Sequence, residues 1–172
     1  MTQEGAALVA LGTRGESSVT TGAAVLDHLL GQLAEAGRFE LRLEVAPDEP
    51  ESEVDAAGVA LGEALRGLLG GADAPGRGVG IVAADEALAM VVVELSGKPL
   101  VASNVDLTST KAGGLRTDLA AAFLNALAET TGLTIHVRLF EGEDSRHVLE
   151  AIFKALGVAL AQACAPGRDE GG

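Results

Sequence analysis

The chain has 172 residues, a formal net charge of −13 and a hydrophobic content of 48%, which excludes an intrinsically disordered protein and suits one compact core or two small fused halves. The acidic balance argues against nucleic acid or an anionic membrane surface as a partner. A single cysteine, Cys164, excludes an intrachain disulfide framework. Because there is also no signal peptide or long apolar segment, the sequence predicts a soluble, cytoplasmic protein.

The first half predicts two strands, a helix, a strand and a helix. Residues 6–11 predict a short apolar strand and residues 17–21 a second strand, and the turn between them predicts a hairpin. A helix follows whose end is marked by Gly37 and whose apolar face consists of Leu26, Leu29, Leu30 and Leu33. Strict alternation over residues 39–45 predicts a half-buried strand, and residues 54–69 predict a second helix.

The same order recurs in the second half of the chain. The predicted strands are residues 79–84, 87–95, 99–104 and 133–140, and the predicted helices are residues 117–131 and 144–164. In the last helix His147 and Glu150 are three residues apart and project from neighbouring positions. Residues 166–172 are predicted to be a disordered tail.

Short sequence matches support an internal duplication. Residues 30–35 match residues 124–129 at an offset of 94, and residues 61–65 match residues 156–160 at an offset of 95. The sequence therefore predicts an α+β fold of two half-domains, residues 1–74 and 75–165, each a small mixed sheet covered by two helices. Neither half buries enough surface alone, so we expect the helical faces of both halves to meet in one core.

Several blocks between about Thr20 and Ala163 occur in the order typical of a known family. They are Thr21-Gly22, Leu26-Asp27-His28-Leu29-Leu30, Ala60-Leu61-Gly62, Asp85-Glu86-Ala87-Leu88-Ala89, Leu95-Ser96-Gly97-Lys98-Pro99, Gly132-Leu133-Thr134-Ile135-His136-Val137 and the helix with His147. The chain thereby resembles imidazoleglycerol-phosphate dehydratase, the manganese-dependent lyase of histidine biosynthesis. The resemblance implies a duplicated half-domain of the ribosomal protein S5 domain 2-like type. It also implies trimers that assemble into a 24-subunit shell, with metals bound between subunits.

The resemblance weakens at the metal-binding motifs. The family's first-half motif, Asp-His-His-x-x-Glu-Asp, is replaced by a segment with Glu51, Ser52 and Asp55 at the two histidines and the glutamate. The second-half motif, His-His-x-x-Glu, has become Arg146-His147-x-x-Glu150. An arginine cannot ligate a metal, and its fixed charge opposes one.

All three histidines of the chain fall on family histidine positions. The resemblance therefore implies a reduced metal site in which the candidate ligands are His28, His136, His147 and Glu150. Glu51 and Asp55 are candidate replacement ligands for magnesium or calcium, although carboxylates are also common at a helix N-terminus. Glu150 and Asp85 are the candidates for vestigial catalytic residues. The alternative is that the histidines are relics that form hydrogen bonds at an interface.

Phosphate binding is the second function that the resemblance implies. Lys98 replaces a family arginine, which keeps the charge but loses the bidentate geometry. Lys111 and Arg116 are further candidates, whereas a solvated turn lysine is the alternative for Lys98.

The sequence leaves three functions open, and with them the question of whether the chain is an enzyme. The first is a divergent dehydratase homologue, catalytically impaired or inactive, with a structural or regulatory role. Such a protein would associate with itself or with an authentic dehydratase, and would carry no cofactor or a residual manganese or zinc ion. The second is an active metal-dependent dehydratase with a rebuilt site, and the third is a metal-free module that binds a phosphorylated metabolite.

Overall fold

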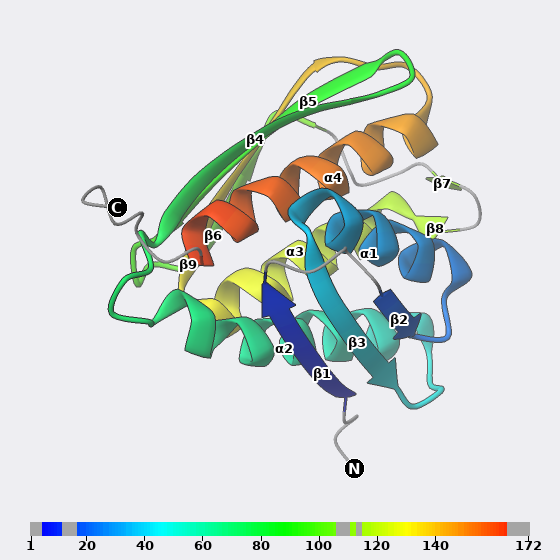
Figure 1. Ribbon diagram of the computed structural model, residues 1–172. Coiled ribbons are helices and arrows are strands. Elements are labelled where there is room, and N and C mark those ends of the chain that lie inside the picture. The colour runs from blue at the N-terminus through cyan, green and yellow to red at the C-terminus, as the bar shows by residue number, and fades with distance from the viewer. Residues whose placement is uncertain (1–4, 12–16, 106–110, 113–114, 165–172) are drawn as a thin grey trace.

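The computed structural model describes residues 5–11, 17–105, 111–112 and 115–164, and in it four helices lie between two sheets (Figure 1). The elements of the first half are β1 (Gly5–Leu11), β2 (Ser17–Thr20), α1 (Ala24–Gly37), β3 (Phe39–Val45) and α2 (Pro50–Leu69). Those of the second half are β4 (Arg77–Ala84), β5 (Ala87–Leu95), β6 (Leu100–Ser103), β7 (Lys111–Ala112), β8 (Leu115–Arg116), α3 (Thr117–Thr131), β9 (Leu133–Glu141) and α4 (Ser145–Cys164). The predicted tail, residues 166–172, lies outside the described residues.

The two main sheets share a topology that follows from the repeat. The strand order is β1-β3-β2 in the first and β4-β5-β9-β6 in the second. In the first sheet β2 runs parallel to β3 and α1 connects them, while in the second β6 runs parallel to β9 and α3 connects them. A parallel pair requires such a crossover, so each half contains the same strand–helix–strand unit.

The predicted hairpin of the first two strands is wrong. Strand β1 pairs antiparallel with β3, and β3 separates it from β2. The reason lies in β3, whose alternating residues bury Phe39, Leu41, Leu43 and Val45 against the helices. A strand with one fully buried face is most stable in the centre of a sheet, where both of its edges are hydrogen-bonded.

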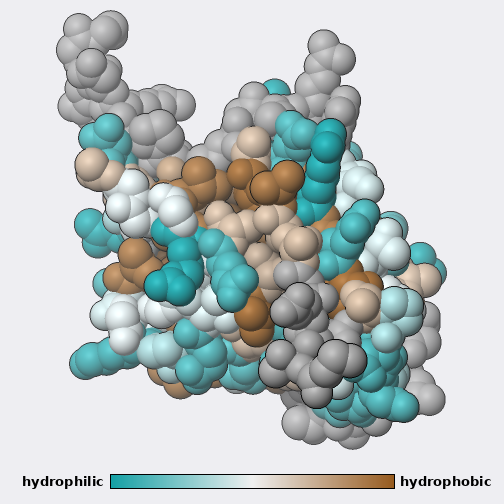
Figure 2. Space-filling model, turned by 90° about the horizontal axis from the view of Figure 1, so that it is seen from below, coloured by the Kyte–Doolittle hydropathy of each residue, from teal (hydrophilic) through white to brown (hydrophobic). Residues whose placement is uncertain are grey.

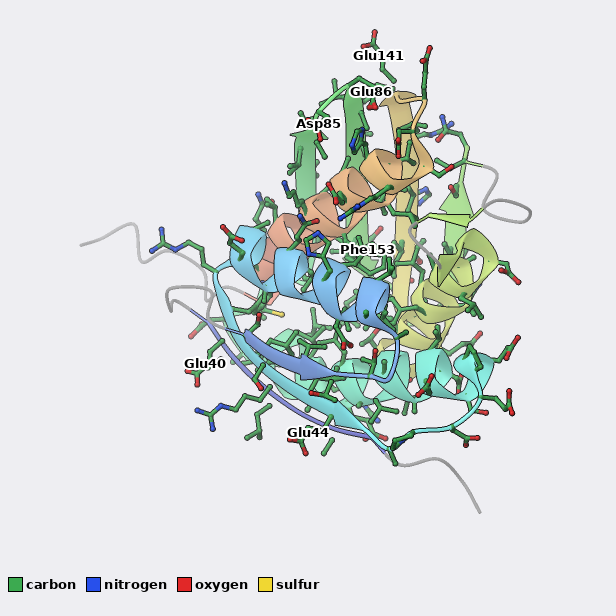
Figure 3. The ribbon with its side chains drawn as sticks, turned by 90° about the vertical axis from the view of Figure 1, so that its right-hand side faces the viewer. Glu40, Glu44, Asp85, Glu86, Glu141 and Phe153 are labelled. Atoms are coloured by element: carbon green, nitrogen blue, oxygen red, sulfur yellow. The ribbon has the colours of Figure 1, made fainter. Side chains whose placement is uncertain are left out.

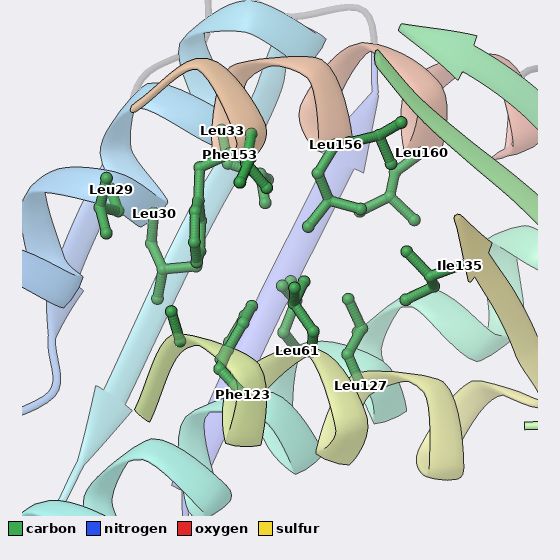
Figure 4. Packing of buried hydrophobic residues seen from close by; sticks show 14 of the residues in the cluster. Leu29, Leu30, Leu33, Leu61, Phe123, Leu127, Ile135, Phe153, Leu156 and Leu160 are labelled. Carbon is green, nitrogen blue, oxygen red and sulfur yellow. The ribbon is translucent and has the colours of Figure 1, made fainter. Parts of the chain in front are cut away.

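The helices pack in two parallel pairs, α1 with α4 and α2 with α3, so each pair takes one helix from each half. The pairs approach closely because glycine lies at the contacts. A Cβ atom on Gly157 of α4 would lie 2.1 Å from the Leu33 carbonyl oxygen of α1, and one on Gly62 of α2 would lie 2.7 Å from Thr130 of α3. Leu30, Phe123 and Phe153 belong to the single core that fills the space between the helices and sheets (Figure 4).

Helix α1 ends at Gly37, as predicted, although this glycine does not adopt the left-handed conformation common at helix ends. The left-handed residue is Arg38, with a φ of 58°, and its amide donates to the Ala34 and Glu35 carbonyls. Gly37 is buried in the helix contact instead, because a Cβ atom there would lie 2.4 Å from the Gly157 carbonyl oxygen.

Two other expectations need correction. Helix α2 begins at Pro50 rather than Val54, with proline in the first turn, where its missing amide is not needed. Helix α4 is long and apolar enough to cross a membrane by length and composition, contrary to the expectation, but 72% of its most apolar window is buried inside the molecule, as in the core helix of a soluble protein. Seen from below the view of Figure 1, the surface carries a group of hydrophobic residues near its centre with hydrophilic residues around it (Figure 2).

Candidate functional site

Helices α1 and α4 start at the same end of the molecule, and their first turns hold the candidate site. The start of α1 is fixed by Thr21, which is fully buried and whose amide donates to Asp27 Oδ1 over 2.8 Å. The start of α4 is fixed by Asp144, whose Oδ1 accepts from the Arg146 amide over 2.8 Å. These hydrogen bonds hold the helix starts that carry His28 on α1 and Arg146 on α4.

Glu150 is the centre of an ion cluster between the two helices. Its Oε1 lies 3.3 Å from His28 Nε2 and 3.4 Å from Arg146 Nε. The Glu150 side chain is 13% exposed, whereas those of His28 and Arg146 are 48% and 61% exposed. Thus a nearly buried carboxylate pairs with a fixed cation from its own helix, at the i,i+4 spacing that favours such pairs, and lies within hydrogen-bond distance of a histidine from the neighbouring helix.

A cleft of about 320 Å³ opens over this cluster. Four apolar and three charged or polar residues line it: Ala24, Val25, His28, Leu29, Arg146, Leu149 and Glu150. The cleft belongs to the contact between the first helix of one half and the second helix of the other.

His147, adjacent to Arg146, points to the tip of the β4–β5 hairpin instead. Its Nδ1 lies 2.6 Å from Glu86 Oε1, and its Nε2 lies 3.3 Å from Asp85 Oδ2. These two carboxylates form the two-residue turn of the hairpin beside the start of α4, with Asp85 in the left-handed region at a φ of 51° (Figure 3). The hydrogen bond that His147 donates to Glu86 raises the pKa of His147, and the charges of Glu86, Asp144 and Asp85 add to the effect.

The third histidine lies elsewhere. His136 is an exposed residue of β9, on the face of the four-stranded sheet that points away from the helices, because its neighbours Ile135 and Val137 point into the core. The cluster of His28 and the hairpin contact of His147 are both on the helical side. In the described part of the chain, no group of three or more His, Cys, Asp or Glu residues is arranged so that it could hold a metal ion.

The repeat also locates the other candidate ligands. At the offset of 95, the residues of α2 that correspond to Arg146, His147 and Glu150 are Glu51, Ser52 and Asp55. Glu51 and Asp55 are exposed in the first two turns of α2, and at the offset of 94 the residue on α3 that corresponds to His28 is Ala122. The corresponding positions of the α2–α3 pair therefore carry two carboxylates and no histidine.

Lys98 and the cysteine lie away from the starts of the helices, whereas Arg116 directly precedes α3. Lys98 is exposed in the turn after β5, as expected, where its amide donates to Ser96 Oγ over 3.0 Å. The backbones of Lys111 and Arg116 belong to β7 and β8, and their side chains lie outside the described part of the chain. Burial raises the pKa of Cys164 to about 12, which makes it an unreactive thiol near the end of α4.

Sequence reasoning missed the two contacts that organise this region. The Arg146–Glu150 pair was detectable from its i,i+4 spacing. The contacts of Glu150 with His28 and of His147 with Glu86 join residues 122 and 61 positions apart. A sequence pattern within a few residues cannot predict contacts between residues so far apart in the chain.

The fold and the site define a class of protein: a duplicated α+β domain whose candidate site lies between the starts of two helices from different halves. The sequence model of the imidazoleglycerol-phosphate dehydratase family matches residues 21–160. The chain belongs to this family and is thus a homologue of an enzyme of histidine biosynthesis.

Individual relatives support the assignment over most of the chain. The imidazoleglycerol-phosphate dehydratase of Clostridium botulinum (strain Kyoto / Type A2) is 38% identical over 153 residues, which is 87% of this chain and 78% of that protein. The crystal structure of the Pyrococcus furiosus enzyme matches with a TM-score of 0.83 and 30% identity, over 98% of this chain and 93% of that one. The Staphylococcus aureus enzyme matches with a TM-score of 0.82 and 29% identity, over 92% and 91% of the two chains.

Proposed function

We propose that this chain is a non-catalytic member of the imidazoleglycerol-phosphate dehydratase family, which keeps the fold as an oligomeric structural or regulatory subunit. The observation that carries the proposal is the ion cluster in which Arg146 Nε lies 3.4 Å from Glu150. By the family resemblance, a histidine is expected at position 146, and Glu150 is part of the same metal motif. Here a permanent cation has the place of a neutral donor and engages the neighbouring carboxylate.

The physical reason is that a divalent ion at this position would meet a second positive charge. Manganese prefers carboxylate and imidazole donors, and a guanidinium has no lone pair to offer. To bind at Glu150 the ion would first have to displace Arg146, and it would then lie beside an uncompensated cation of fixed charge. The residues present therefore do not fit a metal centre of the family type, and we derive no catalytic step through a metal.

The other candidate ligands do not repair this loss. His147 is held by the carboxylates of Glu86 and Asp85, which favour its protonated, non-ligating form. His136 lies on the opposite face of a sheet. On α2, Ser52 has the position that corresponds to His147. A rebuilt site would thus need donors from another subunit at both ends of the molecule.

The decisive experiment is a dehydratase assay with imidazole glycerol phosphate and manganese, run beside the Clostridium botulinum homologue as positive control. We expect no turnover, and less than about a tenth of an equivalent of manganese or zinc per subunit in protein purified without chelator. Turnover at a rate similar to that of the control would overturn the proposal and favour an active enzyme with a rebuilt site.

A matched variant tests the role of the arginine. Arg146→His recreates the second-half motif of the family without changing the first half. We expect the variant to gain weak metal binding in calorimetry, because the cation has been removed, but to remain inactive, because Glu51 and Ser52 still replace the first-half histidines. If wild type and variant bind manganese equally well, Arg146 is not what excludes the metal.

Partners and location follow from the same proposal. We expect self-association, either in trimers or in a larger shell, and association with an authentic dehydratase where both are present in the cytoplasm. Lys98 and Lys111 stay candidates for binding a phosphorylated metabolite. A thermal-shift series with phosphate esters at millimolar concentration, compared between wild type and Lys98→Ala, tests that alternative.

A further inference from the structure

The first sheet leaves one edge of strand β1 open where the second sheet has a further strand. The central strands β3 and β9 correspond at the repeat offset of 94, and each pairs antiparallel with one neighbour, β1 in the first half and β5 in the second. In the second half the other edge of β5 is covered by β4. Within the described residues no strand pairs with the other edge of β1, which packs on α2 (Figure 1).

Burial shows that the place of this further strand is uncovered. The strand registers put Ala7 and Val9 of β1 at the positions of Val91 and Val93 of β5. All four side chains pack towards the core, yet the β5 pair is fully buried and the β1 pair is only partly buried. A strand beside β1 would complete this burial, as β4 does for β5.

The surface of α2 beside β1 is uncovered as well. In the second half β4 lies directly on α4, because a Cβ atom on Gly78 would lie 2.0 Å from the Ala159 carbonyl oxygen. At the offset of 95, Ala64 of α2 corresponds to Ala159, and it is partly exposed whereas Ala159 is fully buried. Gly67, further along the same helix, is exposed and has nothing within 4 Å of the position of a Cβ atom. The chain therefore has a bare, small-residue surface where its other half holds a strand.

Strand β1 also lacks the usual protection of an edge. Its sequence, Gly-Ala-Ala-Leu-Val-Ala-Leu, contains no charge and no proline, although natural edge strands commonly carry such residues to prevent pairing. Leu8 on its outward side is 71% exposed. A strand at a sheet edge offers backbone amides and carbonyls to an incoming strand, which is how sheets bind extended peptides.

We propose that the free edge of β1 binds an extended, basic segment of another protein as an antiparallel fourth strand, with glycine or alanine at the alternate positions that face α2. Strand β4 is the template for this segment. It begins with Arg77, and its Gly78 and Gly80 face α4, where a Cβ atom on either would lie about 2 Å from a helix carbonyl oxygen. A larger side chain at such a position would meet the backbone of α2 in the same way.

The charge of the chain selects a basic segment. The net charge is −13, which attracts and steers cationic partners. One carboxylate lies at the binding position itself, because Glu63 is exposed on α2 where the repeat has Val158 on α4. A Cβ atom on Gly80 would lie 3.0 Å from the Val158 Cβ atom, so the equivalent part of a bound segment would lie beside Glu63.

A second copy of this chain does not fit the same place. Two β1 strands that paired around a two-fold axis perpendicular to the sheet would keep the helices of both copies on one side. Since α2 packs on β1 and, by the repeat, also underlies the open position, the two α2 helices would occupy the same space. The strand that binds must therefore be free of a helix beneath it. Because the open edge uses none of the candidate metal ligands, its test and the dehydratase assay can fail independently.

The first test is fluorescence anisotropy with a labelled synthetic peptide that copies residues 77–84 and carries two lysines at each end. We expect saturable binding to the full chain with a Kd of about 100 μM or tighter. Valine at both glycine positions of the peptide should weaken binding about tenfold or more, because the added side chains meet α2. Glutamates in place of the lysines should weaken it about threefold or more at low salt. No saturation at millimolar peptide, or equal binding of the glycine and valine peptides, would overturn the proposal.

The second test locates the binding position on the protein. Ala64→Leu puts a larger side chain over the open position and should weaken peptide binding about tenfold, whereas Ala122→Leu, the same change at an exposed site of α3, should bind like wild type. Circular dichroism checks that both variants fold. In hydrogen exchange measured by mass spectrometry, the peptide should protect residues 5–11 and not residues 100–103, which form the edge strand β6 of the other sheet. Protection of β6 instead, or protection of β1 that rises with the concentration of the chain alone, would show a different site or a second copy as the occupant and overturn the proposal.

Discussion

A single added methyl group on α4 should separate the helix pair on which the candidate site is built. In Gly157→Ala the new Cβ atom would lie 2.1 Å from the Leu33 carbonyl oxygen and 3.1 Å from the Leu33 Cα atom. Non-bonded heavy atoms are comfortable at roughly 3.5–4 Å, so the two backbones must move apart by more than about 1 Å. A backbone in a helix cannot rotate away as a side chain can.

The expected magnitude follows from two opposing effects. Overpacking costs typically about 1–3 kcal/mol, and a contact with backbone belongs at the upper end. Replacing glycine by alanine in a helix stabilises by about 1 kcal/mol. We therefore expect Gly157→Ala to lower the free energy of unfolding by about 2 kcal/mol, which for a chain of this size lowers Tm by roughly 4–8 °C.

Gly67→Ala on α2 is the matched control, because nothing lies within 4 Å of the Cβ atom it would gain. It keeps the gain in helix propensity without the clash, so it should stabilise the protein by up to about 1 kcal/mol. Urea unfolding followed by circular dichroism, at one protein concentration for both variants, measures the difference. If Gly157→Ala were as stable as Gly67→Ala, the close parallel contact of α1 and α4 would be refuted.

Three further predictions concern the residues around the site. Because the pKa of His147 is raised in the folded state, its protonation stabilises the fold fully below the unfolded pKa of about 6.5, and this stabilisation is lost as the pH rises through the higher folded pKa. The free energy of unfolding should therefore fall between pH 6 and 8 more in wild type than in His147→Gln. Equal pH slopes for the two proteins would contradict the contact with Glu86. Asp27→Ala should cost about 1–3 kcal/mol, because it removes the acceptor of the buried Thr21 amide, whereas Asp55→Ala on the exposed side of α2 should be within about 0.5 kcal/mol of wild type in urea unfolding. Dialysis against a chelator should leave the Tm unchanged in differential scanning calorimetry, and a drop would indicate a structural metal.

Local patterns predicted most elements of the fold because the periodicity was strong. The helix at residues 117–131 and the strand at residues 87–95 have the predicted bounds. Strand pairing could not be predicted in the same way. The short connection after β1 favoured a hairpin, but the buried alternation of β3 made it the central strand. Which strand lies in the middle depends on the burial of both halves together, and no window of a few residues contains that information.

The candidate site shows the same limit. The Arg146–Glu150 pair is within one helix turn and follows from sequence spacing. The approach of His28 to Glu150 depends on the packing of α1 against α4, which in turn depends on Gly37 and Gly157. The sequence assigned Gly37 a role in ending the helix, because glycine is common there, while its buried role required knowledge of the opposite helix.

The exchange of helices between the halves has a consequence for how the chain can change over time. Since α1 packs on α4 and α3 on α2, each half completes the other, as two separate copies of a single half would do in a symmetric pair. In such a pair every substitution appears twice, once at each end. Joining the copies in one chain removes that constraint, so a histidine can persist at position 28 while its counterpart at position 122 becomes alanine. Only in a fused chain can the residues at the two equivalent ends of the molecule differ from each other.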